Sequence, residues 1–138
     1  MNRAPRTTLQ IAAACLFDEA GRLLLVRKRG TQALMLPGGK AEPGEDALTT
    51  LKRELQEELH LNLPDHALSR LGRFHAAAAN EADTWLDAEI FHARLPHAVS
   101  AAAELEELYW LAAHAPHPAN LAPLLREQVL PALGLAPR

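Results

Sequence analysis

The sequence predicts a single α/β domain with a mixed β-sheet covered by helices, and three observations support this. The chain has 138 residues, the size of one ordinary domain. Hydrophobic residues make up 49% and charged residues 22%, which is a globular composition. Strand-like segments, a helix, more strands and a last helix follow one another, an order typical of α/β folds. We therefore expect one domain over residues 1–138.

The first elements predict a β-hairpin. Residues 9–17 are mostly apolar, residues 18–21 have turn composition, and residues 22–29 contain a Leu-Leu-Leu-Val run. Residues 34–36 predict a further short strand. Residues 37–44 contain two prolines and three glycines, which predict a loop.

Residues 46–60 predict a helix with one apolar side. Asp46 is a suitable N-cap, and Pro64 is a stop signal a few residues beyond the helix. The apolar stripe recurs every three or four residues and consists of Leu48, Leu51, Leu55 and Leu59. Such a stripe indicates a helix that packs one face against the sheet.

The second half of the chain predicts three strands and a last helix. The strands are expected at residues 68–79, 84–95 and 105–112. The helix is expected at residues 121–133, with Pro123 in its first turn.

Charge and composition argue against several classes of protein. Lys plus Arg is 14 and Asp plus Glu is 17, so the net charge of -3 disfavours a nucleic-acid or anionic-membrane binder. No apolar run approaches the ~20 residues that span a bilayer, and residues 1–10 lack an apolar signal core. Cys15 is the only cysteine, which excludes an intrachain disulfide. We expect a soluble cytoplasmic protein, and small phosphorylated ligands stay compatible with this charge.

Three carboxylates share one arc of the predicted helix. Glu54, Glu57 and Glu58 are spaced i, i+3 and i+4, so they repel one another near the helix C-terminus. A divalent cation would resolve this conflict, since Mg²⁺ is usually held by a few carboxylates and substrate phosphates. The alternative is a solvated acidic face with Lys52 and Arg53 as partners.

The loop before the helix is also suited to a ligand. Gly38 and Gly39 permit close approach of the backbone, and a carbonyl of this turn suits a cation. Lys40 is placed to reach a phosphate. Taken alone, the segment is equally compatible with an ordinary strand-to-helix turn.

The spacing of these residues resembles the Nudix box, G-x5-E-x7-R-E-U-x-E-E-x-G-U, in which U is aliphatic. Here the pattern runs over residues 39–61 as Gly39, Glu45 and Arg53-Glu54-Leu55-Gln56-Glu57-Glu58-Leu59-His60-Leu61. Eight of its nine defined positions match, and the exception is His60, where the family has glycine.

The resemblance implies a Nudix α/β/α sandwich and a Mg²⁺-dependent hydrolase, with Mn²⁺ as a substitute ion. Such enzymes cleave a phosphoanhydride bond in a nucleoside diphosphate linked to another group. By position, the implied metal ligands are the Gly38 carbonyl, Glu54, Glu57 and Glu58. The resemblance also implies that Arg53 and Glu45 form a buried pair that orients these glutamates.

His60 is expected to alter the helix end slightly without loss of metal binding. The family glycine ends the helix in a left-handed conformation, and histidine there costs on the order of 1 kcal/mol. The general base of the family varies between a box glutamate and a distal one, and we favour Glu54 or Glu57 here. The distal candidates are Glu81, Glu104, Glu106 and Glu107.

The substrate prediction depends on the C-terminal part of the chain. Residues 117–125 resemble the Pro-Ala-Asn segment of MutT-type nucleotide-sanitising enzymes, so Asn120 is a candidate to read a purine edge. Arg27 would line the same pocket, and Lys40 would bind phosphate. The alternatives are a helix N-cap for Asn120 and an exposed strand position for Arg27. Residues 80–81 form either a cleft-lining hairpin tip or a plain turn.

The favoured function is hydrolysis of a (d)NTP or oxidised purine nucleotide to the monophosphate and pyrophosphate. The alternatives are an ADP-ribose or nucleotide-sugar pyrophosphatase and a non-catalytic nucleotide-binding sensor. The chain retains every acidic residue of the box, which disfavours the sensor. The expected partner is a small nucleotide, with no nucleic acid and no membrane. A homodimer is suggested by the family resemblance alone.

Overall fold

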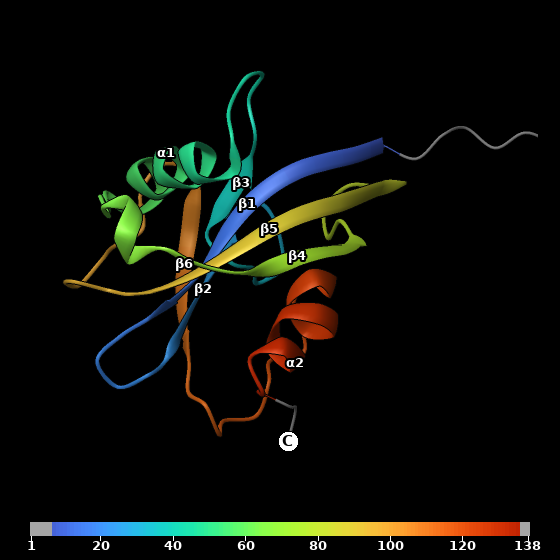
Figure 1. Ribbon diagram of the computed structural model, residues 1–138. Helices are drawn as coiled ribbons and strands as arrows, with labels where there is room; N and C mark the ends of the chain where they lie inside the picture. The colour runs from blue at the N-terminus through green and yellow to red at the C-terminus, as the bar shows by residue number, and fades with distance from the viewer. Residues whose placement is uncertain (1–6, 136–138) are drawn as a thin grey trace, which may run out of the picture.

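A computed structural model describes residues 7–135 and shows one six-stranded sheet, coloured by chain position in Figure 1. The strands are β1 Thr7–Phe17, β2 Leu23–Lys28, β3 Gly38–Lys40, β4 Ser69–Ala77, β5 Thr84–Arg94 and β6 Leu105–Leu111. Their order is β4-β5-β1-β2-β6, and β3 pairs with β1. Because β1 and β5 are parallel while the other pairs are antiparallel, the predicted mixed sheet is confirmed.

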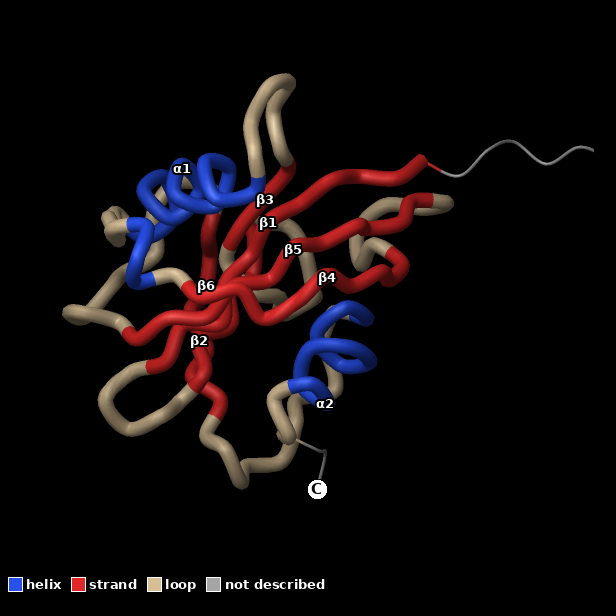
Figure 2. Tube along the Cα trace, viewed as in Figure 1, coloured by secondary structure: helices blue, strands red, loops and turns tan. Residues whose placement is uncertain are grey.

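The central strand β1 divides the core into two layers. Its side chains alternate between the two faces of the sheet. Ala12 and Ala14 belong to the cluster beneath α1 (Ala47–Leu59), and Ala13 and Cys15 belong to the cluster with the C-terminal helical segment. Figure 2 shows the helices α1 and α2 on opposite sides of the sheet. The predicted α/β/α sandwich is therefore confirmed.

Helix α1 begins and ends with caps that the sequence contains. The Asp46 side chain accepts a hydrogen bond from the Thr49 N–H at 2.8 Å. At the other end, His60 has φ 52° and ψ 36°, and its N–H donates to the Gln56 carbonyl at 3.0 Å. The expectation of an altered helix end is wrong, because His60 itself adopts the left-handed conformation expected of a glycine.

The segment around the two glycines differs from the prediction of a loop. Residues 38–40 form β3, and Gly38 lies opposite Ala13 in an antiparallel pair. Gly38 has φ 149°, and a Cβ there would lie 2.2 Å from the Ala12 carbonyl oxygen. Only a glycine permits this close approach to β1. Residues 34–36, predicted as a strand, contribute only isolated bridges in the described structure.

The C-terminal helix begins as a π-helix and ends as an α-helix. A π-helical segment, η2 Leu124–Val129, begins after Pro123 and continues as α2 Leu130–Ala132. The helix predicted at residues 121–133 is therefore present over residues 124–132. Within residues 7–135, no helix is long and apolar enough to cross a membrane.

A buried carboxylate joins three strands on the α1 side of the sheet. Asp87 of β5 is 5% exposed, and Arg73 of β4 donates to its Oδ1 at 2.7 Å. The hydrogen bonds from Arg73 hold the pKa of Asp87 at about 2, against the opposing effect of burial, and Gln10 of β1 adds a smaller effect in the same direction.

We expect Asp87→Asn to lower the free energy of unfolding by about 1–2 kcal/mol at pH 7, a value reduced for the exposed Arg73 side chain. Because the pKa of Asp87 is lower in the folded state, its contribution is present above pH 4 and is lost as pH falls towards 2. Urea unfolding at a series of pH values should therefore show the two proteins converging in acid. The exposed Asp65→Asn is the control, and equal stabilities at pH 7 would contradict the assignment.

Candidate functional site

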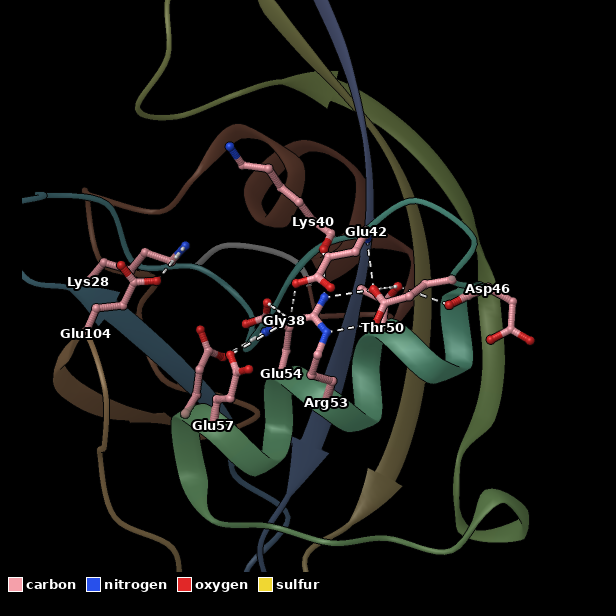
Figure 3. Close-up of polar contacts among 12 residues, drawn as sticks. Lys28, Gly38, Lys40, Glu42, Asp46, Thr50, Arg53, Glu54, Glu57 and Glu104 are labelled. Carbon is pink, nitrogen blue, oxygen red and sulfur yellow. Dashed lines mark hydrogen bonds and ion pairs between the residues drawn. The ribbon is translucent and has the colours of Figure 1, made fainter.

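The glycine turn presses the backbone of β3 against the glutamates of α1. The Gly38 N–H donates to Glu58 Oε1 at 3.1 Å. A Cβ on Gly39 would lie 2.5 Å from the carboxyl carbon of Glu54. Figure 3 shows Gly38 lying over the part of the helix that carries Glu54 and Glu57. A side chain on Gly38 would clash with β1, and one on Gly39 would displace the Glu54 carboxyl group, so both glycines suit a turn packed between β1 and the acidic side chains.

The three glutamates have different surroundings. Glu58 is only 2% exposed, whereas the side chains of Glu54 and Glu57 are 16% and 54% exposed. Burial raises the pKa of Glu58 to about 8, although the Gly38 hydrogen bond opposes this. Burial also raises the pKa of Glu54, and Arg53 opposes the rise. The alternative of a solvated acidic face is therefore wrong for Glu58.

Arg53 connects the loop to the helix. Its Nε and Nη2 donate to the two carboxylate oxygens of Glu45, each at 2.8 Å, and its Nη1 donates to Glu54 Oε1 at 2.9 Å. Nη2 also donates to the Lys40 carbonyl at 3.1 Å. The Arg53 hydrogen bonds hold the pKa of Glu45 at about 2. The contact predicted between Arg53 and Glu45 is present, whereas Lys52 pairs with Asp65 instead of the box glutamates.

The donor chemistry fits a hard cation that the substrate helps to bind. Within residues 7–135, no group of three acidic, histidine or cysteine side chains forms a ready metal cage. Mg²⁺ does not require one, because it keeps waters and substrate phosphates beside one or two carboxylates. Burial of Glu58 disfavours its charge until a positive group lies nearby.

A mostly apolar pocket lies next to this turn, on the side of the C-terminal helical segment. Its apolar wall includes Leu9, Ile11, Leu86, Leu124, Leu125 and the three alanines at positions 77–79. Gly38 and Gly39 also line the pocket, so the contacts of the glutamates and the pocket meet at the same turn. The pocket and the carboxylates therefore share this turn, although none of the three glutamates is among the described residues that line the pocket.

The polar side chains of the pocket come from the glycine turn, β2 and the β4–β5 turn. Lys40 lines the pocket, and its Nζ lies 3.9 Å from Glu81 Oε1. Asn80 and Glu81 both line the pocket, so this turn is the predicted cleft-lining hairpin tip. Lys28, which was not predicted from the sequence, also lines it.

Two predicted pocket residues lie elsewhere. Arg27 Nε donates to Glu107 Oε1 at 3.0 Å, and Asn120 Nδ2 donates to the Gln32 carbonyl at 2.8 Å. Neither is among the described residues that line the pocket. Asn120 is not a helix N-cap either, because the helical segment is preceded by Pro123, which makes no side-chain cap bond.

The distal glutamates occupy different positions relative to the site. Glu106 and Glu107 pair with Arg29 and Arg27, so neither is placed at the glycine turn by a described contact. Glu104 lies 3.7 Å from Lys28 Nζ, and Glu81 borders the pocket. The distal candidates nearest the site are therefore Glu104 and Glu81.

The sandwich fold and the acid-bearing helix behind a glycine turn define a Nudix-type protein. The family model for the NUDIX domain matches residues 7–133, and the chain belongs to this family. It is 38% identical to an 8-oxo-dGTP diphosphatase of Haemophilus influenzae over 55 residues, which are 37% of this chain and 40% of that relative. The curated relative is therefore matched over less than half of its length.

Solved structures confirm the fold. A MutT NUDIX hydrolase from Burkholderia pseudomallei superimposes with a TM-score of 0.71 at 22% identity, covering 94% of this chain and 98% of that one. A bifunctional NMN adenylyltransferase/ADP ribose pyrophosphatase from Francisella tularensis gives 0.66 at 17% identity, covering 96% and 42%. The predicted family resemblance is confirmed.

Proposed function

We propose that this chain is a Mg²⁺-dependent pyrophosphohydrolase that cleaves a phosphoanhydride bond in a nucleoside diphosphate linked to another moiety. The favoured substrate is a (d)NTP or an oxidised purine nucleotide, giving the monophosphate and pyrophosphate. The observation that carries the proposal is the turn at Gly38 and Gly39, which contacts Glu58 and Glu54 and also lines the apolar pocket. A nucleoside in the pocket would thereby direct its phosphates towards the carboxylates.

The proposed metal ligands are the Gly38 carbonyl, Glu54, Glu57 and Glu58. When bound there, a divalent cation neutralises phosphate charge and lowers the pKa of a water. Arg53 orients Glu54 through its hydrogen bond, while Glu45 fixes the guanidinium from the other side. Lys40 binds phosphate at the mouth of the pocket.

The proposed general base is Glu54 or Glu57, with Glu104 as the distal alternative. Glu57 has the more exposed side chain, so water reaches it most readily. Glu54 is fixed by Arg53, which gives it the more defined position. Either carboxylate would take a proton from the attacking water.

Base recognition by Asn120 is proposed from the Pro-Ala-Asn resemblance. One amide hydrogen is engaged by Gln32, so the side chain must turn from this contact to reach a base. Asn120 lies outside the described pocket lining, which removes support from the purine triphosphate prediction. The second candidate function is hydrolysis of ADP-ribose or a nucleotide sugar. A homodimer and a cytoplasmic location stay predictions.

The first test is product release from a panel of nucleotides with and without Mg²⁺. The panel contains dNTPs, oxidised purine triphosphates, ADP-ribose, nucleotide sugars and dinucleoside polyphosphates. We expect pyrophosphate from purine triphosphates and its loss on chelation. Asn120→Ala should lower kcat/KM for purine substrates about tenfold relative to pyrimidine substrates, the size of one lost base contact.

The matched control is Asn62→Ala, an exposed asparagine beyond α1. Turnover of ADP-ribose or nucleotide sugars alone would replace the triphosphate proposal by the second candidate. An absence of turnover with every substrate, while nucleotides still bind, would instead support the sensor.

A further inference from the structure

Lys28 lies at the apolar pocket and close enough to Glu54 and Glu58 for its charge to act on both carboxylates. It lines the pocket together with Gly38 and Gly39. Its Nζ lies 3.7 Å from Glu104 Oε1, and its side chain is 32% exposed. Figure 3 shows Lys28 and Glu104 side by side. This cation therefore faces both the solvent-accessible pocket and the acidic end of α1.

Its position follows from an irregularity in the sheet. The regular register of β2 against β6 places Arg27 opposite Glu107, and a shift between Arg27 and Lys28 then places Lys28 opposite Leu105. The Arg29 N–H donates to the Glu104 carbonyl at 2.8 Å, which holds Glu104 beside the end of β2. Arg27 is thereby bound to Glu107, while Lys28 lines the pocket.

The connection before β6 also contacts the catalytic helix. The Ala102 N–H donates to the Glu58 carbonyl at 2.8 Å. Burial raises the pKa of Glu58, and the charge of Lys28 opposes that rise while the charge of Glu104 adds to it. Lys28 and Glu104 are therefore electrostatically linked to the carboxylates that are proposed to hold the cation.

We propose that Lys28 is a phosphate-positioning residue that leaves Glu104 for the substrate phosphate nearest the glutamates. This inference rests on the proposed function. The Lys28–Glu104 pair is loose at 3.7 Å and the Glu104 side chain is 64% exposed, so exchange costs little. A phosphate offers more oxygen acceptors, and the flexible lysine stem can follow it. Binding of substrate would thus release the Glu104 carboxylate beside the site.

The test measures binding of an α,β-methylene nucleoside triphosphate by calorimetry in Mg²⁺. We expect Lys28→Met to bind it about tenfold more weakly, the effect of one lost charge-assisted contact. Lys28→Arg should restore most of the affinity. Binding of the unphosphorylated nucleoside should not change, and KM should rise more than kcat falls. Lys52→Met is the control, because Lys52 pairs with Asp65.

A second variant tests the exchange itself. Glu104→Gln should bind the analogue more tightly than the original chain, since Lys28 is then available before substrate arrives. The gain should disappear in Lys28→Met/Glu104→Gln. If Glu104→Gln raised the affinity equally in the original chain and in Lys28→Met, simple repulsion between Glu104 and the phosphates would explain the gain, and the exchange would be overturned. A loss of affinity in Glu104→Gln would also overturn it.

These experiments distinguish a failure of the role proposed for Lys28 from a failure of the proposed hydrolase function. Unchanged analogue binding in Lys28→Met, with normal turnover by the original chain, would overturn the role of Lys28 and leave the proposed hydrolase standing. An original chain that neither binds nor hydrolyses any nucleotide of the panel would overturn both proposals.

Discussion

Glu57→Gln and Glu58→Gln are each expected to lower kcat at least about a thousandfold, which corresponds to ~4 kcal/mol of transition-state stabilisation. An amide keeps the shape of the carboxyl group but supplies no charge for a cation. The measurement is single-turnover hydrolysis in Mg²⁺, with Mn²⁺ binding followed by electron paramagnetic resonance. Both variants should bind the ion more weakly, so the loss of turnover has an independent readout.

The folded state should tolerate Glu58→Gln because the substitution removes a charge from a buried position. Burial raises the pKa of Glu58 to about 8, so without a cation the charged carboxylate destabilises the fold. Because the pKa of Glu58 is higher in the folded state, its contribution to the stability of the original chain falls as pH rises from the ordinary carboxyl range through 8. A glutamine carbonyl still accepts the Gly38 N–H. In the presence of a chelator at pH 9, Glu58→Gln should therefore melt at the same or a higher temperature.

The control for both substitutions is Glu106→Gln, which alters a glutamate paired with Arg29 on the surface. It should leave turnover and ion binding unchanged. Turnover retained by Glu57→Gln would remove that residue from the proposed ligands. A Glu58→Gln variant that melts well below the original chain at pH 9 would show that its charge stabilises the fold.

The acidic part of the site could be predicted from the sequence because its three glutamates lie on one continuous helix. Periodicity fixed the face of Glu54, Glu57 and Glu58, and the box spacing added Arg53 and Glu45. The structure confirms the contact between the latter two residues. The cap at Asp46 was also predicted, since capping depends on neighbours within one turn.

The lining of the pocket could not be predicted from the sequence because it depends on contacts between segments that are distant along the chain. Arg27 was predicted to line the pocket, but the regular register of β2 against β6 places Arg27 beside Glu107, to which it donates. Lys28, which follows the register shift, lines the pocket instead. The glycine turn was predicted as a loop because strand propensity disfavours Gly-Gly. It pairs with β1 since residues without Cβ atoms allow the close approach.

Arg53→Lys is expected to lower kcat about a hundredfold and the free energy of unfolding by about 2 kcal/mol, although the charge is retained. Arg53 donates to both oxygens of Glu45, to Glu54 and to the Lys40 carbonyl. A lysine is a point charge and cannot satisfy these acceptors in a planar geometry. Steady-state kinetics and urea unfolding measure the two losses, and Arg70→Lys, which alters a loose pair with Glu89, is the control.

A double-mutant cycle that combines Arg53→Lys with Glu45→Gln decides how Arg53 acts. If Arg53 orients Glu54 through its anchorage to Glu45, both single variants misplace the same carboxylate, so their losses in kcat should be far from additive. Mn²⁺ binding should weaken in both, since Glu54 is a proposed ligand. If Arg53 instead contacts the substrate directly, Arg53→Lys would mainly raise KM and the two losses would add. The structure favours the first result, because the guanidinium nitrogens already donate to Glu45, Glu54 and the Lys40 carbonyl.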